Sequence, residues 1–222
     1  MEGEEYDATK EYIKNWHKVT MQEYGYHNLL GSDCQPICGH ERFKGSLLIT
    51  PLGETVLDFG QNFAGYVEFT IRAKKNQKLV LTHGETLDKN GNFTIDNFQN
   101  PRKPECFQRV TYICKEGKNE FRPTKSYFGF RYIKIESDIE ITGEEFTGVA
   151  IYSDMKETGW FKCGNDDVNQ LYSNSLWSLK SNFIGVPTDC PTREKSGFTG
   201  DAQIFCHSAL YLMDSYPFSV NG

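Results

Sequence analysis

The chain has 222 residues, of which 38% are hydrophobic and 14% aromatic, and its formal net charge is -6 at pH 7. This composition suits a globular fold, and the acidic balance gives no general attraction to nucleic acid or to an anionic membrane surface. The first residues are acidic and polar where a secretory signal has a basic end and an apolar run, and no stretch approaches the ~18 apolar residues of a membrane span. We therefore expect a cytoplasmic protein without nucleic-acid or membrane partners.

The seven cysteines are odd in number and scattered, and only Cys34 and Cys38 are near neighbours. A zinc site usually shows closely paired ligands, and disulfides are uncommon in the cytoplasm. We therefore expect reduced thiols, no metal site and no cofactor.

Strand patterns begin at Ser46, whereas residues 1–44 set aromatic side chains among charges without a readable period. The later segments alternate or run apolar and end at Gly, Asn or Lys clusters, which is the pattern of short strands. The predicted strands are residues 46–50, 54–59, 65–73, 78–87, 109–115, 120–123, 131–137 and 145–153. Their spacing and Gly-rich turns predict an antiparallel β-sandwich over residues 45–155.

Six polar residues interrupt the apolar pattern of this predicted sandwich. They could form a sugar-binding face, or they could satisfy backbone groups at strand ends and domain contacts. Because antiparallel strands normally present polar residues on one face, we favour the structural interpretation. The six are Asp58, Gln61, Asn62, His83, Glu85 and Arg131.

A helical period replaces the strand pattern after Trp160. Asn165 is a favourable N-cap, and Asp166 and Asp167 would lie at the positive end of the helix dipole. The apolar spacing that follows predicts a helix over residues 166–183.

A second helix is predicted over residues 201–213, which read DAQIFCHSALYLM. This segment is apolar on most of its circumference, as a helix buried among other helices would be. We therefore interpret His207 as a core residue rather than as a ligand.

The segment VPTDCPTREKSGFTGDAQI joins the two predicted helices. It holds the carboxylates Asp189, Glu194 and Asp201 near Arg193, with more charge and more Pro and Gly than a helix connection requires. One interpretation is a solvated loop whose residues cap helices, with Thr199 as the cap of the second helix. The other is an active site, and three acids beside an arginine favour it.

The same segment resembles the signature loop of bacterial α-L-rhamnosidases, glycoside hydrolase family 78, through DCP, REK and TGDAQ. Four upstream segments resemble this family in the same order, so the resemblance covers nearly the whole chain. They are DFGQNFAGYV (58–67), HGETLDKNGNF (83–93), FGFRYIKI (128–135) and NDDVNQLYSNSLWS (165–178). Thr192, Ser196 and Phe198 depart from the family pattern, in which we expect Gln, Leu and Trp.

The resemblance implies a mixed fold, with an antiparallel β-sandwich followed by the first helices of an (α/α)6 barrel. Residues 1–44 would be a linker or the tail of a preceding sandwich domain, residues 45–155 the sandwich, and residues 156–222 the N-terminal part of the catalytic barrel. The implied activity is that of an inverting α-L-rhamnosidase, which releases terminal L-rhamnose from a rhamnose-containing glycoside or oligosaccharide.

By its position in the motif, Glu194 resembles the family's general acid. Asp189 and Asp201 fit acceptors for the vicinal hydroxyls of rhamnose, with Arg193 as an orienting donor. Phe198 could pack on the 6-methyl face of the sugar. An inverting enzyme also needs a second carboxylate, ~6.5 to 9.5 Å from the acid, that activates water. The resemblance places this base later in the barrel and outside this chain, so we expect the chain to be inactive alone.

Two alternatives remain open. One is a non-catalytic carbohydrate-binding β-sandwich with trailing helices. The other is a glycoside hydrolase of another substrate, since a fold does not determine its chemistry. The sequence leaves the aglycone, the linkage and the oligomeric state undetermined.

Overall fold

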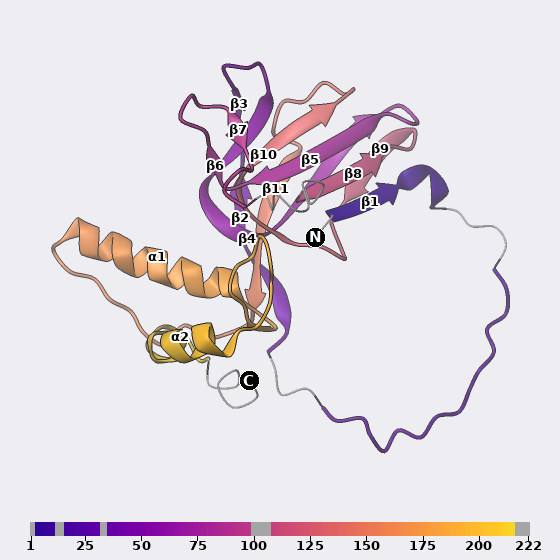
Figure 1. Ribbon diagram of the computed structural model, residues 1–222. Helices are drawn as coiled ribbons and strands as arrows, with labels where there is room; N and C mark the ends of the chain where they lie inside the picture. Colours follow the sequence, from indigo (N-terminus) through magenta and orange to yellow (C-terminus); the bar gives the residue numbers. More distant parts are fainter. Residues whose placement is uncertain (1–2, 12–15, 32–34, 99–107, 216–222) are drawn as a thin grey trace.

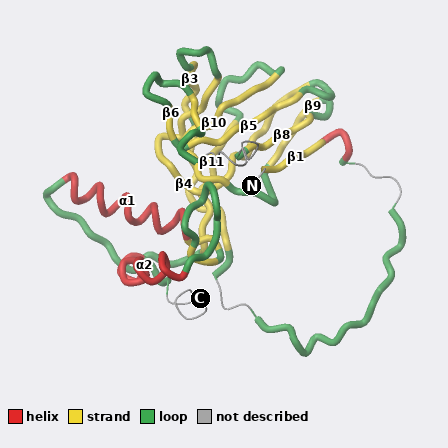
Figure 2. The backbone as a smooth tube through the Cα atoms, in the orientation of Figure 1, coloured by secondary structure: helices red, strands yellow, loops and turns green. Residues whose placement is uncertain are grey.

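The computed structural model describes residues 3–11, 16–31, 35–98 and 108–215. In that part of the chain the β-strands form one block, and two helices, α1 (Asp166–Asn182) and α2 (Thr199–Leu212), lie at one side of it (Figure 1). Figure 2 shows the same division, with one short 3-10 helix, η1 (Ala8–Lys10), near the start of the chain. Within these described ranges, no helix is long and apolar enough to cross a membrane.

The block is a nine-stranded sheet whose order is β1-β8-β5-β10-β4-β11-β2, with β3 and β9 also paired to β4. Its strands are β1 (Gly3–Asp7), β2 (Ile37–Lys44), β3 (Ser46–Ile49), β4 (Thr55–Ala73), β5 (Lys78–Gly84), β8 (Arg109–Ile113), β9 (Gly117–Phe121), β10 (Phe128–Ser137) and β11 (Phe146–Ser153). Two small sheets pair β6 (Thr86–Leu87) with β7 (Phe93–Thr94) and β12 (Phe183–Ile184) with β13 (Val186–Pro187). The pairing is antiparallel except between β1 and β8. A β domain followed by helices is thus confirmed.

Strand β4 is long enough to connect the two layers of the curled sheet. Its first half pairs with β3 and β10, and its second half pairs with β11 and β9. Between the two halves, Phe130 of β10 pairs with Phe63 of β4, and Tyr132 of β10 pairs with Asp58. The segment of β4 between these pairs is longer than the segment of β10, so β4 bulges. Gly60 lies in this bulge with a φ of 83°, which side chains with a Cβ rarely adopt. The sequence pattern predicted two strands here, and the structure joins them through the bulge.

Aromatic side chains dominate the core of the sheet. Phe63, Phe128, Phe130 and Phe146 are each exposed by 1% or less. The rings of Phe63 and Phe130 lie 4.6 Å apart between centroids. Burying such a side chain contributes about 1.5–3 kcal/mol, and an aromatic pair adds about 0.5–1.5 kcal/mol. This core accounts for much of the stability of the sheet.

Two edge strands of the sheet come from the first 44 residues. Strand β1 pairs with β8, and β2 pairs with β11. The expectation that residues 1–44 form a linker or tail outside the sandwich is therefore wrong for residues 3–7 and 37–44. Edge strands carry charged residues on exposed positions, so their alternation is weak in the sequence and the pairing decides their structure. Residues 16–31 form an extended loop that leaves the sheet (Figure 1).

Helix α1 begins where the sequence predicted and packs against the sandwich. Oδ1 of Asn165 accepts hydrogen bonds from the N–H groups of Asp167 (2.9 Å) and of the next residue (3.3 Å). Near the other end, Nζ of Lys180 lies 3.0 Å from Oε1 of Glu41 in β2 and 2.9 Å from Oε1 of Glu157. The predicted packing of this helix on the sheet is confirmed by its contacts with β4 and β11.

Helix α2 begins at Thr199, and its N-cap residue is Phe198. Phe198 makes no capping hydrogen bond through its side chain. The expectation that Thr199 caps this helix is wrong, because Thr199 already lies within its first turn.

Several large apolar side chains of α2 are exposed. Ala209 and Leu212 are buried, but Ile204 is 84% exposed and Tyr211 is 80% exposed. His207 is exposed as well, so its expected place in the core is wrong. Among the described residues, α2 therefore buries only part of its apolar side chains.

Candidate active site

The acidic loop, which we define as residues 188–198, connects β13 to α2 and is closed by its own hydrogen bonds. The N–H of Thr188 donates to the carbonyl of Asn182 at the end of α1 (2.7 Å). The N–H of Asp189 donates to the carbonyl of Ser196 (3.0 Å), and the N–H of Ser196 donates to Oδ1 of Asp189 (3.0 Å). These bonds give the loop a defined shape between the two helices.

Cys190 brings two of the three carboxylates together. Its Sγ lies 3.3 Å from Oδ2 of Asp189 and 3.1 Å from Oε2 of Glu194, so its single S–H proton can donate to either carboxylate. Partial burial raises the pKa of Asp189, but hydrogen bonds from Ser196 and Cys190 outweigh it and hold this pKa below its ordinary value. Asp189 is therefore an ionised hydrogen-bond acceptor at neutral pH, as its expected role requires.

Glu194 and Arg193 lie side by side on the outer part of the loop. Nε of Arg193 is 3.5 Å from Oε2 of Glu194, and their side chains are 57% and 43% exposed. An exposed pair of this kind contributes only about 0–1 kcal/mol to stability. This pair therefore adds little to the stability of the fold, and Arg193 lies beside the carboxylate of Glu194.

Asp189 and Asp201 line one cavity of about 270 Å³ between the end of α1 and the start of α2. We call it the loop cavity. Its other lining residues are Ser178, Asn182, Phe183, Pro187, Thr188, Ala202, Ile204 and Phe205. Of the five residues predicted for the site, the structure brings these two aspartates together. Glu194 adjoins Asp189 through the thiol of Cys190, whereas Arg193 and Phe198 do not line the cavity.

The acidic loop also contains a residue whose role the sequence analysis missed. Lys195 has a φ of 52°, which is rare for a residue with a side chain, and its ammonium group donates to the carbonyl of Tyr127. The ammonium lies 4.3 Å from the centre of the Tyr127 ring. Burial lowers the pKa of Lys195 to about 8. Lys195 thus anchors the loop to the residue just before β10, and its adjacency to Glu194 was the only signal in the sequence.

Three of the six polar residues of the sandwich have structural roles. Nε and Nη2 of Arg131 each donate to the carboxylate of Asp58 at 2.8 Å. His83 is fully buried, its Nδ1 lies 2.9 Å from the carbonyl of Gln108, and burial lowers its pKa to about 3. The structural interpretation holds for Asp58 and Arg131, which pair with one another, and for Nδ1 of His83. Nε2 of His83 is buried without a hydrogen-bond partner among the described residues.

The other three, Gln61, Asn62 and Glu85, line a second cavity of about 350 Å³ between the bulge of β4 and α1. Ser178 and Asn182 of α1 line both this cavity and the loop cavity. For these three residues, the alternative of a polar binding face therefore remains open.

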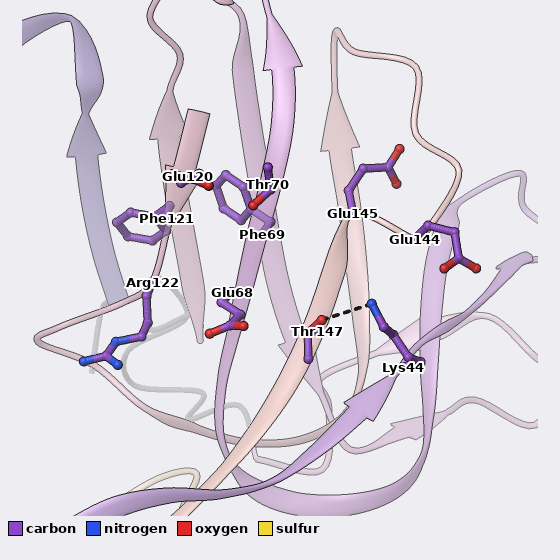
Figure 3. A pocket seen from close by; sticks show the side chains of 10 residues that line it. All are labelled: Lys44, Glu68, Phe69, Thr70, Glu120, Phe121, Arg122, Glu144, Glu145 and Thr147. Atoms are coloured by element: carbon purple, nitrogen blue, oxygen red, sulfur yellow. Dashed lines mark hydrogen bonds between the residues drawn. The ribbon is translucent and has the colours of Figure 1, made fainter. Parts of the chain in front are cut away.

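A larger hollow of about 520 Å³ lies on the sheet, away from the acidic loop (Figure 3). Lys44 in this hollow donates to the hydroxyl of Thr147 (3.3 Å), and Glu68 forms an ion pair with Arg42. It contains no residue of the acidic loop. The candidate site is therefore the smaller loop cavity, because Asp189 and Asp201 line it.

Asp189, Cys190 and Glu194 are the only group of potential metal ligands found among the described residues, with ligand atoms within 4.8 Å of one another. The Cys190 thiol lies within hydrogen-bonding distance of both carboxylates. Hydrogen bonding of its single proton to either carboxylate is compatible with the closeness of the three groups.

Comparison with known proteins bears directly on this loop. Residues 49–152 match the family model described as the bacterial alpha-L-rhamnosidase concanavalin-like domain. Residues 156–221 match the bacterial alpha-L-rhamnosidase 6 hairpin glycosidase domain. The two matched ranges follow one another along the chain, and the second contains the acidic loop.

Individual relatives agree with these matches. An alpha-L-rhamnosidase of Formosa agariphila is 38% identical over 178 residues, which are 79% of this chain and 18% of that protein. The crystal structure of an Aspergillus terreus alpha-L-rhamnosidase superimposes with a TM-score of 0.80 at 30% identity, covering 89% of this chain and 23% of that one. That of the Streptomyces avermitilis enzyme complexed with L-rhamnose has a TM-score of 0.80 at 27% identity, covering 86% and 19%.

The chain thus spans about a fifth of the length of these relatives, 18% to 23%. The matches include both the sheet and the segment that carries the carboxylates. The two matching family models and the relatives all carry the description alpha-L-rhamnosidase. This chain belongs to the family of bacterial α-L-rhamnosidases.

Proposed function

We propose that this chain is the part of an inverting α-L-rhamnosidase that carries the general acid and part of the sugar site. The observation that supports this most directly is the acidic loop, in which Asp189 and Asp201 line one cavity and Glu194 adjoins Asp189. The loop cavity would receive a terminal L-rhamnose. The relatives named as α-L-rhamnosidases support the substrate class.

In this proposal Glu194 protonates the glycosidic oxygen as the bond to the leaving group breaks. Asp189 and Asp201 accept hydrogen bonds from ring hydroxyls, which fixes the sugar in place. Arg193 is an orienting donor to the sugar, and Lys195 holds the loop against the sandwich. Phe198 does not line the loop cavity but is 48% exposed beside it, so its proposed contact with the 6-methyl group would be made from outside the cavity.

Inversion needs a second carboxylate that activates water on the opposite face of the sugar, ~6.5 to 9.5 Å from the acid. We place this base outside the chain. Glu194 is 43% exposed here, so the described residues supply little of the water exclusion that the reaction requires. The 222-residue chain should therefore release little or no rhamnose from an aryl rhamnoside. Turnover by the purified chain at a rate near that of a full-length relative would contradict this expectation.

The acid role of Glu194 is tested in the intact parent enzyme with two leaving groups. Glu194→Gln removes the transferable proton and should cost roughly 10²- to 10⁴-fold on a natural rhamnoside that departs poorly. A nitrophenyl rhamnoside needs less protonation, so the loss on it should be small. Asp189→Asn and Asp201→Asn weaken hydroxyl contacts and should impair both substrates similarly.

Equal losses on the two substrates for Glu194→Gln would remove the acid role. The loop would then serve binding alone, as in a non-catalytic carbohydrate-binding module. That alternative draws support from the amide side chains beside the loop, which suit sugar hydroxyls without any acid chemistry.

A further inference from the structure

The acidic loop packs closely on the start of β10, at a glycine. Gly129 is buried, and a Cβ at this position would lie 2.6 Å from Cγ of Pro191 and 2.8 Å from Cγ2 of Thr192. Contacts of a Cβ under 3.0 Å essentially do not occur in proteins. The φ of Gly129 is not positive, so the contact with the loop, and not the backbone conformation, excludes a side chain here. A side chain at position 129 would therefore displace the loop.

A second contact holds the loop a few residues further on. The ammonium group of Lys195 donates to the carbonyl of Tyr127, and it lies 4.3 Å from the centre of that ring and 5.1 Å from the centre of the Phe128 ring. A cation near aromatic rings is attracted by their faces, and the attraction grows when water is excluded. We call residues 127–129 the loop seat. The loop seat thus contacts the acidic loop on both sides of Glu194.

The loop seat is held in place by Gln108, a residue that is 2% exposed. Nε2 of Gln108 donates to the carbonyl of Gly129 (3.0 Å), and Oε1 accepts from the N–H of Gly129 (3.3 Å). Strand β5 pairs with β10 only from Tyr132 onward, so this amide takes the place of a neighbouring strand. The carbonyl of Gln108 accepts in turn from the N–H of His83 (2.8 Å) and lies 2.9 Å from its Nδ1. Gly129 therefore has little freedom to move away from the loop.

The position of Glu194 depends on the position of the loop. Its side chain is 43% exposed, and its polar contacts with Arg193 (3.5 Å) and Cys190 (3.1 Å) lie within the same loop, so they move with it. Misplacing a catalytic group by about 1 Å can cost about 100-fold in rate. Resting on the proposed function, we infer that Gln108 and Gly129 of the sandwich are positioning residues, which set where the proton donor stands relative to the bound sugar.

The first test measures the intact parent enzyme with two leaving groups. Gly129→Ala should lower kcat about tenfold on a natural rhamnoside that departs poorly, but less than about threefold on a nitrophenyl rhamnoside, because only the first needs the proton. KM should stay within about twofold on both substrates. Gly164→Ala is the matched control and should keep both activities, because no atom lies within 4 Å of where its Cβ would be.

A second set of variants separates positioning from a general loss of stability. Pro191→Ala with Thr192→Ser removes the two atoms that approach Gly129, and the gap should lower kcat on the natural rhamnoside about threefold. Adding Gly129→Ala to this pair fills the gap and should raise kcat again. A substitution that lowers activity in one background and raises it in the other acts through the contact itself. Gln108→Met should show the same dependence on the leaving group, and it decides the test if Gly129→Ala fails to fold.

The position of the loop is followed in the 222-residue chain through the reactivity of its thiol. Each cysteine is labelled with N-ethylmaleimide, and its peptide is quantified by mass spectrometry. Gly129→Ala and Gln108→Met should each raise the labelling rate of Cys190 at least about threefold, because a displaced loop opens more often. The rate at Cys163, before α1, should stay within about 1.5-fold and serves as the internal reference.

Three results overturn the inference when Glu194→Gln behaves as the loss of an acid. They are equal losses on the two substrates for Gly129→Ala and Gln108→Met, a lower kcat on adding Gly129→Ala to the Pro191 and Thr192 variant, and an unchanged labelling rate at Cys190. Failure of the proposed function gives a different result, in which Glu194→Gln itself shows equal losses. In that case a raised labelling rate at Cys190 still supports positioning of the loop by the sandwich, and an unchanged rate overturns it.

Discussion

The sandwich and the helical part of this chain differ in how completely they bury their apolar side chains. Phe63, Phe130 and Phe146 of the sheet are at most 1% exposed, whereas Ile204 and Tyr211 of α2 are 84% and 80% exposed. Hydrophobic burial is the main stabilising contribution to a fold, so the sheet carries most of the stability. The carboxylates of the proposed site lie in the less tightly packed part. The sheet thus provides most of the stability, whereas the helical part that follows it in the chain holds the carboxylates of the proposed site.

The largest expected effect comes from the core of the sandwich. Phe130→Ala removes a side chain that is fully buried and should lower the free energy of unfolding by about 3–5 kcal/mol. Tyr211→Ala on α2 is the matched control, and its effect should stay within about 0.5 kcal/mol. Urea unfolding followed by circular dichroism measures both. Similar losses for the two variants would show that the two regions do not differ in packing.

An intermediate effect is expected where α1 attaches to the sandwich. Lys180 has a side chain that is 7% exposed and lies between Glu41 and Glu157, whose side chains are each 35% exposed. Lys180→Met should cost about 1–3 kcal/mol, below the ~3–5 kcal/mol of a fully buried pair, because water still reaches both carboxylates.

The control for Lys180→Met is Lys118→Met, which breaks the exposed pair of Lys118 with Glu120. Its cost should be about 0–1 kcal/mol. Hydrogen exchange should also accelerate in α1 of the Lys180 variant before it accelerates in β10. Equal acceleration in both elements would mean that Lys180 does not join two separable regions.

A third effect is a pH dependence that arises where the acidic loop meets the sheet. Burial lowers the pKa of Lys195 from 10.5 to about 8. Between pH 8 and 10.5 the unfolded chain therefore binds more protons than the folded chain, and the free energy of unfolding rises with pH. Below pH 8 both states are protonated, so the cost of the buried charge is fully present.

Lys195→Met should flatten this rise, whose slope is at most about 1.4 kcal/mol per pH unit for one proton. Unfolding in urea at several pH values from 7.5 to 10.5 gives the slopes of both proteins. Parallel curves for the wild-type chain and the variant would mean that Lys195 does not titrate in this window.

The sequence predicted those features that depend on neighbouring residues. Asn165 was predicted to cap the first helix, and its side chain does accept two backbone hydrogen bonds. The alternating or continuous apolar pattern predicted β5, β8, β10 and β11, whose residues are mostly buried or half-buried. The concentration of Asp189, Glu194 and Asp201 between two helical patterns also pointed to the loop that carries the proposed site.

Features that depend on contacts between distant segments were not predictable in this way. The sequence pattern divides β4 at the bulge, and only pairing with β10 and β11 makes it continuous. Strands β1 and β2 are defined by the edges that they join. Gln61 lines the second cavity, between the bulge of β4 and α1, whereas Asp58, three residues earlier, pairs with Arg131.

Local periodicity, capping and charge thus determined the elements of this protein and the place of its candidate site in the chain. The tertiary structure decided which polar residues are paired and which line a cavity. It also decided that Lys195 is anchored at Tyr127 and that α2 leaves large apolar side chains exposed. The physical reason is that hydrogen bonding to a neighbour along the chain is short-ranged, whereas burial depends on every segment that packs against a residue.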